Sequence, residues 1–167
     1  MINKIKRKTV LFIINSFLST TRYFVIKRVL LNFSGISVGK GSKIVGPIYI
    51  GTVAQLTIGE DSWIGSGLNI YGNGIVKIGD KCDLAPDIGF ITGSHEIGNI
   101  DRRAGLGVTY EIEVQNGCWV GARSTIMGNV TIFESSIIGT CSLVNKNVIE
   151  NTIVTGIPAK VIKVLEI

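Results

Sequence analysis

Apolar residues recur at intervals of six through most of this 167-residue chain. The series starts at Val38 and reaches Phe90, with two residues skipped at 56–57 and two more at 76–77. It resumes at Val114 after an interruption of eighteen residues. The fifteen positions are Val38, Ile44, Ile50, Ile58, Ile64, Ile70, Ile78, Leu84, Phe90, Val114, Val120, Ile126, Ile132, Ile138 and Val144. Such a fixed period predicts a solenoid in which each repeat buries one large side chain against its neighbours.

Small residues mark a second position of the repeat, four places after the apolar one. They are Ser42, Ala54, Ser62, Gly74, Cys82, Ser94, Cys118, Ser124, Ser136 and Ser142. Seven apolar positions are followed directly by Gly, which tolerates the backbone angles of a corner. Three repeats make one turn, so the sequence predicts five coils, at 38–55, 58–75, 78–95, 114–131 and 132–149. The expected fold class is all-β, a triangular parallel β-helix whose skipped residues bulge outward at one corner.

The first 34 residues differ from the repeat and contain neither Gly nor Pro, which favours helix. We therefore expect a basic, apolar helical segment at 1–34 and the β-helix domain at 35–167. Residues 1–59 hold nine Lys or Arg and no acidic residue, whereas the remainder holds eight basic and twelve acidic residues. The net charge of +5 is thus a property of the N-terminal end.

Two compatible roles fit this helical segment. The helices can cap the open end of the β-helix and pack on a neighbouring subunit. A basic, apolar helix too short to span a bilayer can also lie in the interface of an anionic membrane. The second role gives an otherwise cytoplasmic protein peripheral contact with the inner face of the cell membrane through residues 1–33. Nucleic acid is not an expected partner, because the basic residues are not interleaved with aromatic ones.

The three cysteines, Cys82, Cys118 and Cys141, are odd in number and form no CxxC pair. Two of them occupy small-residue positions of the repeat, so we interpret them as reduced, half-buried side chains of a cytoplasmic protein. A catalytic cysteine is the alternative, but no neighbouring group would lower the pKa of the thiol.

Four segments occur in an order and spacing typical of one enzyme family. They are Ile-Gly-Asp at 78–80, Thr-Gly-Ser-His at 92–95, the segment 114–126 and the closing segment 156–163. Through them residues 36–165 resemble the hexapeptide-repeat acyltransferases, in particular the galactoside, maltose and polysaccharide O-acetyltransferases. The resemblance implies a left-handed β-helix, a homotrimer, acetyl-CoA as the donor co-substrate and active sites between adjacent subunits.

His95 is the only histidine and stands directly before the eighteen-residue insertion. A long loop on a rigid repeat body is usually functional. The spacing of seventeen residues after Ile78 also resembles that of the family's catalytic histidine. An imidazole, with an ordinary pKa of about 6.5, can take the proton of a sugar hydroxyl as it attacks a thioester. A backbone carbonyl or a carboxylate such as Asp87 would orient the ring.

The insertion at 96–113 is expected to be an active-site loop, which in the family covers the site. Arg102 and Arg103 would bind an anionic sugar, a nucleotide diphosphate or the donor, unless they are simply solvated. The family's acceptor-contacting Asn aligns nearest to Gly67, with Asn69 close by. The family's acceptor recognition therefore does not carry over, and Asn69 stays a candidate acceptor contact.

The donor site follows from the resemblance alone. Trp119, Gly121 and Ala122 match the segment whose backbone lines the pantetheine groove, and Gly139 with Thr140 match a contact one coil further on. The remaining matches are Asn145 and Lys146 near the far end of the donor, and Lys160 and Lys163 beside its phosphates. The alternative is that Trp119 packs at a corner and the lysines are solvated.

Three function classes remain open at this point. The first is an acetyl-CoA-dependent sugar O-acetyltransferase in surface polysaccharide or glycan biosynthesis, with His95 as general base; the same base would serve N-acylation of an amino sugar. The second is a non-catalytic β-helix scaffold. A β-helix metal enzyme of the carbonic anhydrase kind, the third, needs several His ligands for zinc, so no metal is expected.

Overall fold

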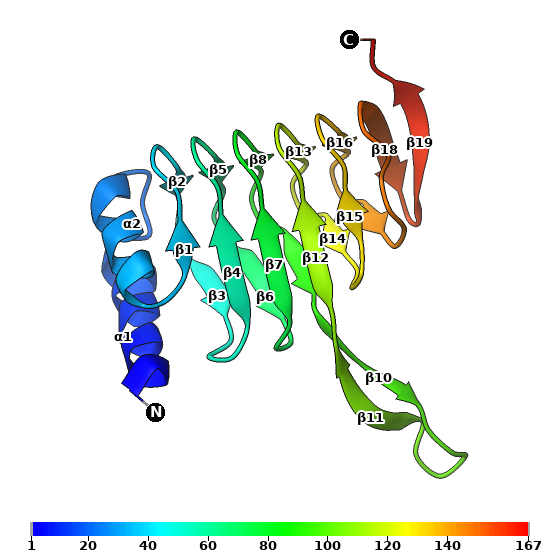
Figure 1. The fold of residues 1–167 in the computed structure, drawn as a ribbon, viewed down its shortest axis with the longest axis horizontal. Helices are drawn as coiled ribbons and strands as arrows, with labels where there is room; N and C mark the ends of the chain where they lie inside the picture. The colour runs from blue at the N-terminus through cyan, green and yellow to red at the C-terminus, as the bar shows by residue number, and fades with distance from the viewer. Residues whose placement is uncertain (1, 167) are drawn as a thin grey trace.

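A computed structural model describes residues 2–166, with side chains from Lys4, and shows two helices followed by a solenoid of short strands (Figure 1). The helices are α1 (Ile2–Phe17) and α2 (Phe24–Phe33). Three sheets, here called A, B and C, form the sides of the solenoid, and the chain runs through them in that order in every coil. No helix within residues 2–166 is long and apolar enough to cross a membrane.

Each sheet stacks one strand from each successive coil. Sheet A contains β1 (Ser37–Val38), β4 (Gln55–Ile58), β7 (Ile75–Ile78), β12 (Glu111–Val114) and β15 (Thr131–Ile132). Sheet B contains β2 (Lys43–Ile44), β5 (Trp63–Ile64), β8 (Asp83–Leu84), β13 (Trp119–Val120), β16 (Ile137–Ile138), β18 (Thr152–Gly156) and β19 (Ala159–Val164). Sheet C contains β3 (Ile48–Ile50), β6 (Leu68–Tyr71), β9 (Gly89–Ile91), β14 (Thr125–Ile126) and β17 (Leu143–Val144).

The six-residue register predicted from the sequence is confirmed. All fifteen apolar positions are buried, and those of one sheet stand in register from coil to coil, as Ile44, Ile64 and Leu84 do in sheet B. The strands are parallel, and backbone hydrogen bonds join each coil to the next at close to 2.8 Å, for example from the Gly59 N–H to the Ile78 carbonyl. Burial is therefore shared between coils rather than concentrated in one centre.

The residues skipped at 56–57 and 76–77 do not bulge outward, and this expectation was wrong. They lie inside β4 and β7, where Leu56 and Val76 are buried and stand in register with Ile112. The reason is the two-residue alternation of a strand: Leu56 and Ile58 point inward while Thr57 points out. The extra residues of these two coils therefore lie in the turns that precede β4 and β7.

The solenoid extends beyond the five predicted coils by a partial sixth turn. Val148 forms a bridge with Ile132, and Val154 of β18 pairs with Ile138 of β16. The sequence count stopped at 149 because the spacing from Ile132 to Val148 is sixteen residues instead of eighteen. The last strand, β19, then turns back and pairs antiparallel with β18, so it covers the end of sheet B.

Small polar side chains at the corner between sheets A and B connect successive coils. Ser42 Oγ donates to the Gly59 carbonyl at 2.7 Å and accepts from the Ser62 N–H at 2.9 Å. Ser62 repeats this pattern with Gly79 and Cys82. Because each hydroxyl satisfies backbone groups that no strand partner reaches, the predicted column of small residues is confirmed as a hydrogen-bonded corner.

The two helices cover the first coil, and polar side chains complete its exposed edge. Asn15 of α1 bonds both backbone groups of Ile48, at 2.8 Å and 2.9 Å, and Asn32 of α2 does the same for Val38. Arg7 donates to the Ala54 carbonyl at 2.5 Å. Each asparagine amide offers one donor and one acceptor, as a peptide group does, so it takes the place of a missing strand. The capping role expected of this segment is thus visible in the structure.

Close approach of the coils leads to a stability prediction. A Cβ on Gly59 would lie 2.6 Å from the Gly79 carbonyl carbon, whereas a Cβ on Gly107 would meet no atom within 4 Å. We expect Gly59→Ala to lower the free energy of unfolding by about 1–3 kcal/mol, because two of the three nearest atoms, Gly79 C and Asp80 N, are backbone and cannot rotate away. Gly107→Ala, the matched control, should change it little. Thermal melts of both variants measure the difference, and equal melting points would contradict the packing described here.

Candidate active site

Within residues 2–166, the only long interruption of the solenoid is a β-hairpin that leaves the corner between sheets C and A (Figure 1). It consists of β10 (Gly93–Ile97) and β11 (Ala104–Thr109), paired antiparallel. At its base the Tyr110 N–H donates to the Thr92 carbonyl at 2.9 Å. The excursion thus begins and ends about three residues earlier than the expected loop at 96–113, because Ile112 is buried and belongs to β12.

His95 lies on β10, near the base of this hairpin and opposite Gly107. Its side chain is exposed and lines a hollow of about 500 Å³ together with Tyr71, Asn73 and Ser94. Ser94 was expected to be a small core residue of the third coil, but it is exposed because the chain has already left the coil after Thr92. The imidazole is therefore presented on an arm beside the coil rather than at the coil's last position.

No hydrogen bond joins the His95 imidazole to another described residue. Asp87, the carboxylate suggested as its orienting group, instead lies beside Arg123, with Oδ2 at 3.9 Å from the Arg123 Nε. Both of these residues are at the corner between sheets B and C, whereas the hairpin leaves from the corner between sheets C and A. Within one chain the ring and this carboxylate occupy different corners, so Asp87 does not orient the His95 of its own chain.

Asn73 is the polar side chain that sequence reasoning missed at this hollow. It lies between Gly72 and Gly74, in the turn of the second coil at the same corner as the hairpin. The Gly-Asn-Gly turn was the available signal. It was overlooked because the extra residues of the coil were placed at 76–77 instead of in this turn.

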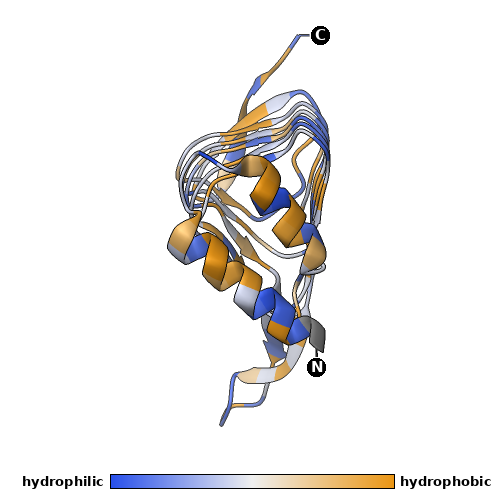
Figure 2. Cartoon of the chain, turned by 90° about the vertical axis from the view of Figure 1, so that its left-hand side faces the viewer, coloured by the Kyte–Doolittle hydropathy of each residue, from blue (hydrophilic) through white to orange (hydrophobic). Residues whose placement is uncertain are grey.

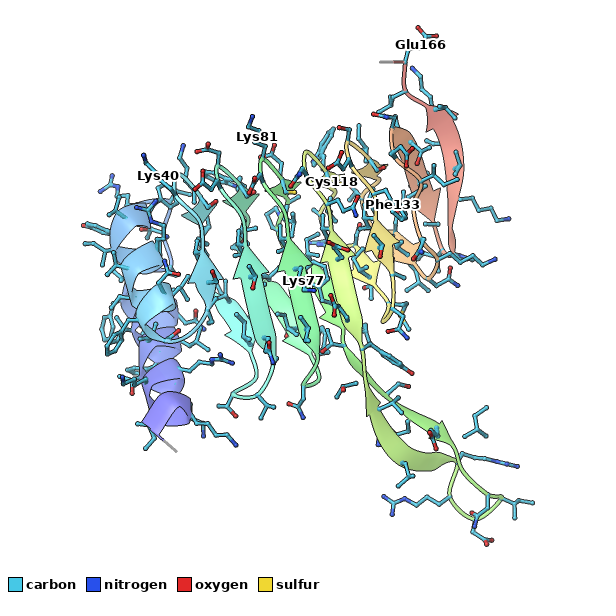
Figure 3. The ribbon with its side chains drawn as sticks, in the orientation of Figure 1. Lys40, Lys77, Lys81, Cys118, Phe133 and Glu166 are labelled. Atoms are coloured by element: carbon cyan, nitrogen blue, oxygen red, sulfur yellow. The ribbon has the colours of Figure 1, made fainter. Side chains whose placement is uncertain are left out.

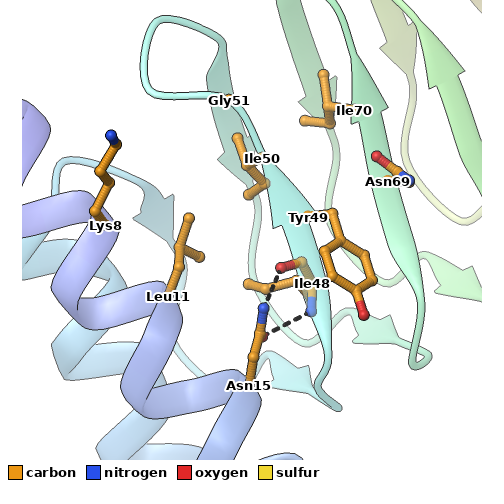
Figure 4. Close-up of a pocket in the computed structure, with 9 residues that line it drawn as sticks. All are labelled: Lys8, Leu11, Asn15, Ile48, Tyr49, Ile50, Gly51, Asn69 and Ile70. Carbon is orange, nitrogen blue, oxygen red and sulfur yellow. Dashed lines mark hydrogen bonds between the residues drawn. The ribbon is translucent and has the colours of Figure 1, made fainter.

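Asn69, the predicted acceptor contact, is on the outer face of sheet C and not in the hollow of His95. It lines two further hollows, one of about 250 Å³ shared with Tyr71 and Tyr49, and one of about 370 Å³ between α1 and β3. Figure 4 shows the second of these, with Tyr49 and Asn69 on one side and Lys8 on the helix. Tyr71 also lines the His95 hollow, so the three hollows follow one another across sheet C.

Arg102 and Arg103 lie at the tip of the hairpin and are exposed. The turn is held by the Asn99 side chain, whose Oδ1 accepts from the Arg102 N–H at 3.0 Å, and by a bond from the Gly98 N–H to the Arg103 carbonyl. Both guanidinium groups are therefore carried beyond the hollow of His95, on the far end of the arm.

Five of the predicted donor residues come together on sheet B and the corner that follows it. Trp119 is 54% exposed on the outer face of β13. Gly121 and Ala122 form the corner of the fourth coil, and Gly139 and Thr140 form that of the fifth. A Cβ on Gly121 would lie 2.6 Å from the Thr140 nitrogen, so glycine lets the two coils meet and leaves flat backbone at the surface.

The remaining predicted donor residues divide between two places. Lys160 of β19 pairs with Thr155 of β18, one coil beyond Gly139, and Lys163 pairs with Ile153 of the same strand. Asn145 and Lys146 follow β17 and thus lie at the corner between sheets C and A, on the same edge as the hairpin. All four side chains are exposed, as are Lys40, Lys77 and Lys81, which are labelled in Figure 3.

No family model matches the sequence. The chain is 28% identical over 127 residues to the galactoside O-acetyltransferase of Escherichia coli, a match that covers 76% of this chain and 63% of that enzyme. It is also 28% identical over 134 residues to WcaF of the same species, named as a colanic acid biosynthesis acetyltransferase, with 80% of this chain and 72% of WcaF covered. These matches support the resemblance to the hexapeptide-repeat acyltransferases, in their sugar O-acetyltransferase branch.

A crystal structure confirms the fold of this chain. A hexapeptide-repeat acetyltransferase from Vibrio cholerae, crystallised with acetyl-CoA, has a TM-score of 0.83 and 24% identity, and the match covers 99% of this chain and 88% of that chain. The left-handed parallel β-helix expected from the resemblance is thus shown. Against the curated galactoside enzyme, by contrast, the chain spans only 63% of the relative's length.

Two of the three cysteines are structural. Cys82 and Cys118 are buried in the column of small residues, where Cys82 Sγ donates to the Gln115 carbonyl at 3.0 Å. Burial raises the pKa of Cys82 and raises that of Cys118 to about 11, so both remain protonated thiols at neutral pH. Cys141 is exposed at the corner between sheets B and C, and its N–H donates to the Ala122 carbonyl.

The difference in burial predicts a difference in thiol reactivity. At pH 8 we expect N-ethylmaleimide to modify Cys141 rapidly in the folded protein. Cys82 and Cys118 should react only after unfolding, because alkylation needs an accessible thiolate. Intact-mass spectrometry counts the adducts, and Cys141→Ser should remove the fast one. Rapid modification of a second thiol in the folded protein would contradict the buried positions.

Within residues 2–166 no cluster of three or more His, Cys, Asp or Glu side chains is arranged to hold a metal ion.

Proposed function

We propose that this protein transfers an acetyl group from acetyl-CoA to a hydroxyl of a sugar, in the synthesis of a surface polysaccharide or another glycan. The observation that carries the proposal is the position of the sole histidine, His95, on a rigid hairpin beside a hollow with the polar groups of Tyr71 and Asn73. The names of the galactoside and colanic acid relatives support the reaction class and the sugar acceptor.

His95 would act as the general base. One imidazole nitrogen takes the proton of the acceptor hydroxyl while the oxygen attacks the thioester carbonyl carbon. The tetrahedral oxyanion accepts a hydrogen bond from a backbone N–H, and the intermediate then collapses with cleavage of the carbon–sulfur bond. The imidazolium returns the proton to the departing thiolate, so the products are the acetyl ester, CoA and neutral histidine.

The donor fits the corner formed by the fourth and fifth coils. Gly121 and Gly139 leave backbone exposed for the pantetheine arm, and Trp119 offers an exposed ring beside it. Lys160 and Lys163, on the next coil and strand, carry positive charge that suits the phosphates. The acetyl-CoA complex of the similar Vibrio protein supports this choice of donor. Since acetyl-CoA is a cytoplasmic metabolite, we place the reaction on the cytoplasmic side of the cell membrane.

The arrangement also supports a homotrimer with sites between subunits. His95 and Gly121 stand at opposite edges of sheet C in one chain, so a donor at the Gly121 corner does not face the imidazole of the same chain. Side-by-side packing of three solenoids brings the hairpin corner of one copy against the donor corner of the next. Asn145 and Lys146, at the hairpin corner, would then contact a donor held by the neighbouring copy.

The acceptor would enter the hollow of His95 and continue across sheet C. Asn73 is placed to bond a sugar hydroxyl, and the exposed rings of Tyr71 and Tyr49 can stack on pyranose faces. Asn69, between these rings, would bind the next residue of a longer glycan. Arg102 and Arg103, at the hairpin tip, are suited to an anionic group on the acceptor or on the donor of a neighbouring copy.

Removing the base tests the reaction directly. We expect His95→Ala to lower kcat for acetyl transfer to a sugar acceptor by roughly 100-fold or more, the usual contribution of a positioned base. Its melting temperature should stay unchanged, because the imidazole bonds no described residue. Ile97→Ala, at another exposed position of β10, is the control and should retain activity. A His95→Ala variant with normal turnover would overturn the proposal and favour the non-catalytic scaffold.

A mixing experiment tests whether each site is shared between subunits. His95→Ala lacks the base, and Ala122→Trp would block the donor corner; each variant alone should be inactive. Reassembled from an equal mixture, random trimers should regain about a quarter of the wild-type rate, because that share of the interfaces combines an intact His95 with an intact Ala122. Light scattering checks that trimers form. No recovery in such trimers would show that one chain supplies both parts.

A further inference from the structure

The helical cap has two faces of different character. Its inner face packs on the first coil through Val10, Ile14 and Leu31, which are all buried. Its outer face points away from the solenoid along the solenoid's axis, as the end-on view in Figure 2 shows. The contacts of the inner face account for the cap as a structural element, but they leave the outer face unexplained.

The outer face carries an unusual number of large apolar side chains. In α1 the rings of Phe12 and Phe17 are 63% and 72% exposed and contact each other edge to face at 6.1 Å. In α2 and its first turn the exposed residues are Tyr23, Val25, Ile26, Val29 and Phe33. Ile5 adds an eighth near the start of α1. A concentration of apolar residues on one face marks an interaction surface.

Basic residues accompany these apolar residues along the sequence of the cap, and no acidic residue occurs before Glu60. Two of the basic residues serve the cap itself: Arg7 bonds the first coil, and Lys27 is buried and donates to the Thr20 carbonyl at 2.7 Å. The remaining ones are Lys4, Lys6, Lys8, Arg22 and Arg28. Lys6 lies over the Phe33 ring, with its Nζ at 4.6 Å from the ring centroid, so charge and apolar surface meet directly.

We propose that this face binds the surface of an anionic lipid bilayer. The helices, of sixteen and ten residues, are too short to cross a membrane but can lie in its interface, with aromatic rings among the acyl chains and lysines at the phosphates. A second copy of the cap is the less favourable occupant, because it would bring two faces without a single acidic residue together. A nucleic acid would leave the phenylalanine and valine side chains without a suitable partner.

The direction of this face gives the bilayer a defined orientation to the rest of the molecule. The solenoid axis stands along the membrane normal, with the cap on the lipid and the C-terminal end furthest from it (Figure 1). In the proposed trimer, whose threefold axis is parallel to the solenoids, the three caps lie in one plane. Three weak contacts then act together, so the trimer binds far more tightly than one cap.

A membrane beneath the cap also points to the class of acceptor, and this step rests on the proposed function. The hollow between α1 and β3 opens beside Lys8 at the base of the cap, and the hollows that follow it lead over Asn69 and Tyr71 to His95. A glycan attached to a lipid can therefore stay in the bilayer at its lipid end while its sugar residues reach the imidazole. The geometry assigns a lipid-linked glycan as the acceptor class.

Vesicle flotation of the full chain tests the membrane contact. Wild-type protein should float with vesicles of equal parts phosphatidylcholine and phosphatidylglycerol, and much less with pure phosphatidylcholine, because the lysines need anionic lipid. Phe12→Ser combined with Phe17→Ser should lower the partition coefficient about tenfold or more, since both rings leave the acyl region. Ile97→Ser with Leu106→Ser, which alters equally exposed apolar residues of the hairpin, is the matched control and should float normally.

Four outcomes would overturn the membrane contact. They are absence of wild-type flotation, equal flotation on both lipids, equal loss in the phenylalanine and hairpin variants, and unaltered flotation of the phenylalanine variant. If that last variant also changes its mass in light scattering, the face mediates contacts between copies instead. Transfer to a soluble sugar should be the same in wild type and in the phenylalanine variant. The proposed function therefore stands or falls separately, by the His95→Ala result.

Discussion

The distance between neighbouring coils governs this structure. Parallel strands lie about 4.8 Å apart, and each coil has to follow the last at that spacing around all three sides. One inward side chain per short strand fills the interior, and glycine is required where corners of successive coils meet, as at Gly59 and Gly121. The serine column satisfies the backbone groups that the turning chain cannot pair. The result is a rigid prism whose outer faces are free to carry chemistry.

The hairpin is the one place in the described chain where a coil is interrupted at length, and it is anchored where the spacing is restored, between Thr92 and Tyr110. The two-stranded arm thereby carries His95 beside Tyr71 and Asn73 of the second coil. The donor residues need the opposite condition, an uninterrupted corner with bare backbone. The two requirements are met at different corners of the prism, so under the proposed function the complete site would form between neighbouring copies.

The sequence predicted best what depends on local periodicity. All fifteen inward positions followed from counting, because each needs only to be apolar at the right interval. The inward direction of Leu56 and Val76 was missed, although the alternation with Thr57 and Lys77 was visible, because the extra residues were assigned to the wrong part of the coil. The same error hid Asn73. The sixth turn was missed because its spacing shortens. The number of residues in each turn decides which residues of neighbouring coils lie next to each other. That number cannot be read from the sequence of one repeat.

For the site, His95 could be singled out because it combines a unique residue type with the only long interruption. The donor residues came from resemblance to a family, since glycines and a surface tryptophan have no chemical signature of their own. The partner of the imidazole could not be found this way: Asp87 is near His95 in the sequence, but the two belong to different corners. The two faces of the helical segment became distinguishable only when Arg7, Asn15 and Lys27 were seen to point inward.

The asparagines that mimic a strand on the first coil have a consequence for assembly. A solenoid of stacked parallel strands ends in open peptide groups, and two such ends can join into a fibre of unlimited length. Asn15 and Asn32 form hydrogen bonds with such groups at one end, and β19 turns back and pairs with β18 of sheet B at the other. Strand addition is therefore blocked at the capped edges of sheets A and C at one end and of sheet B at the other.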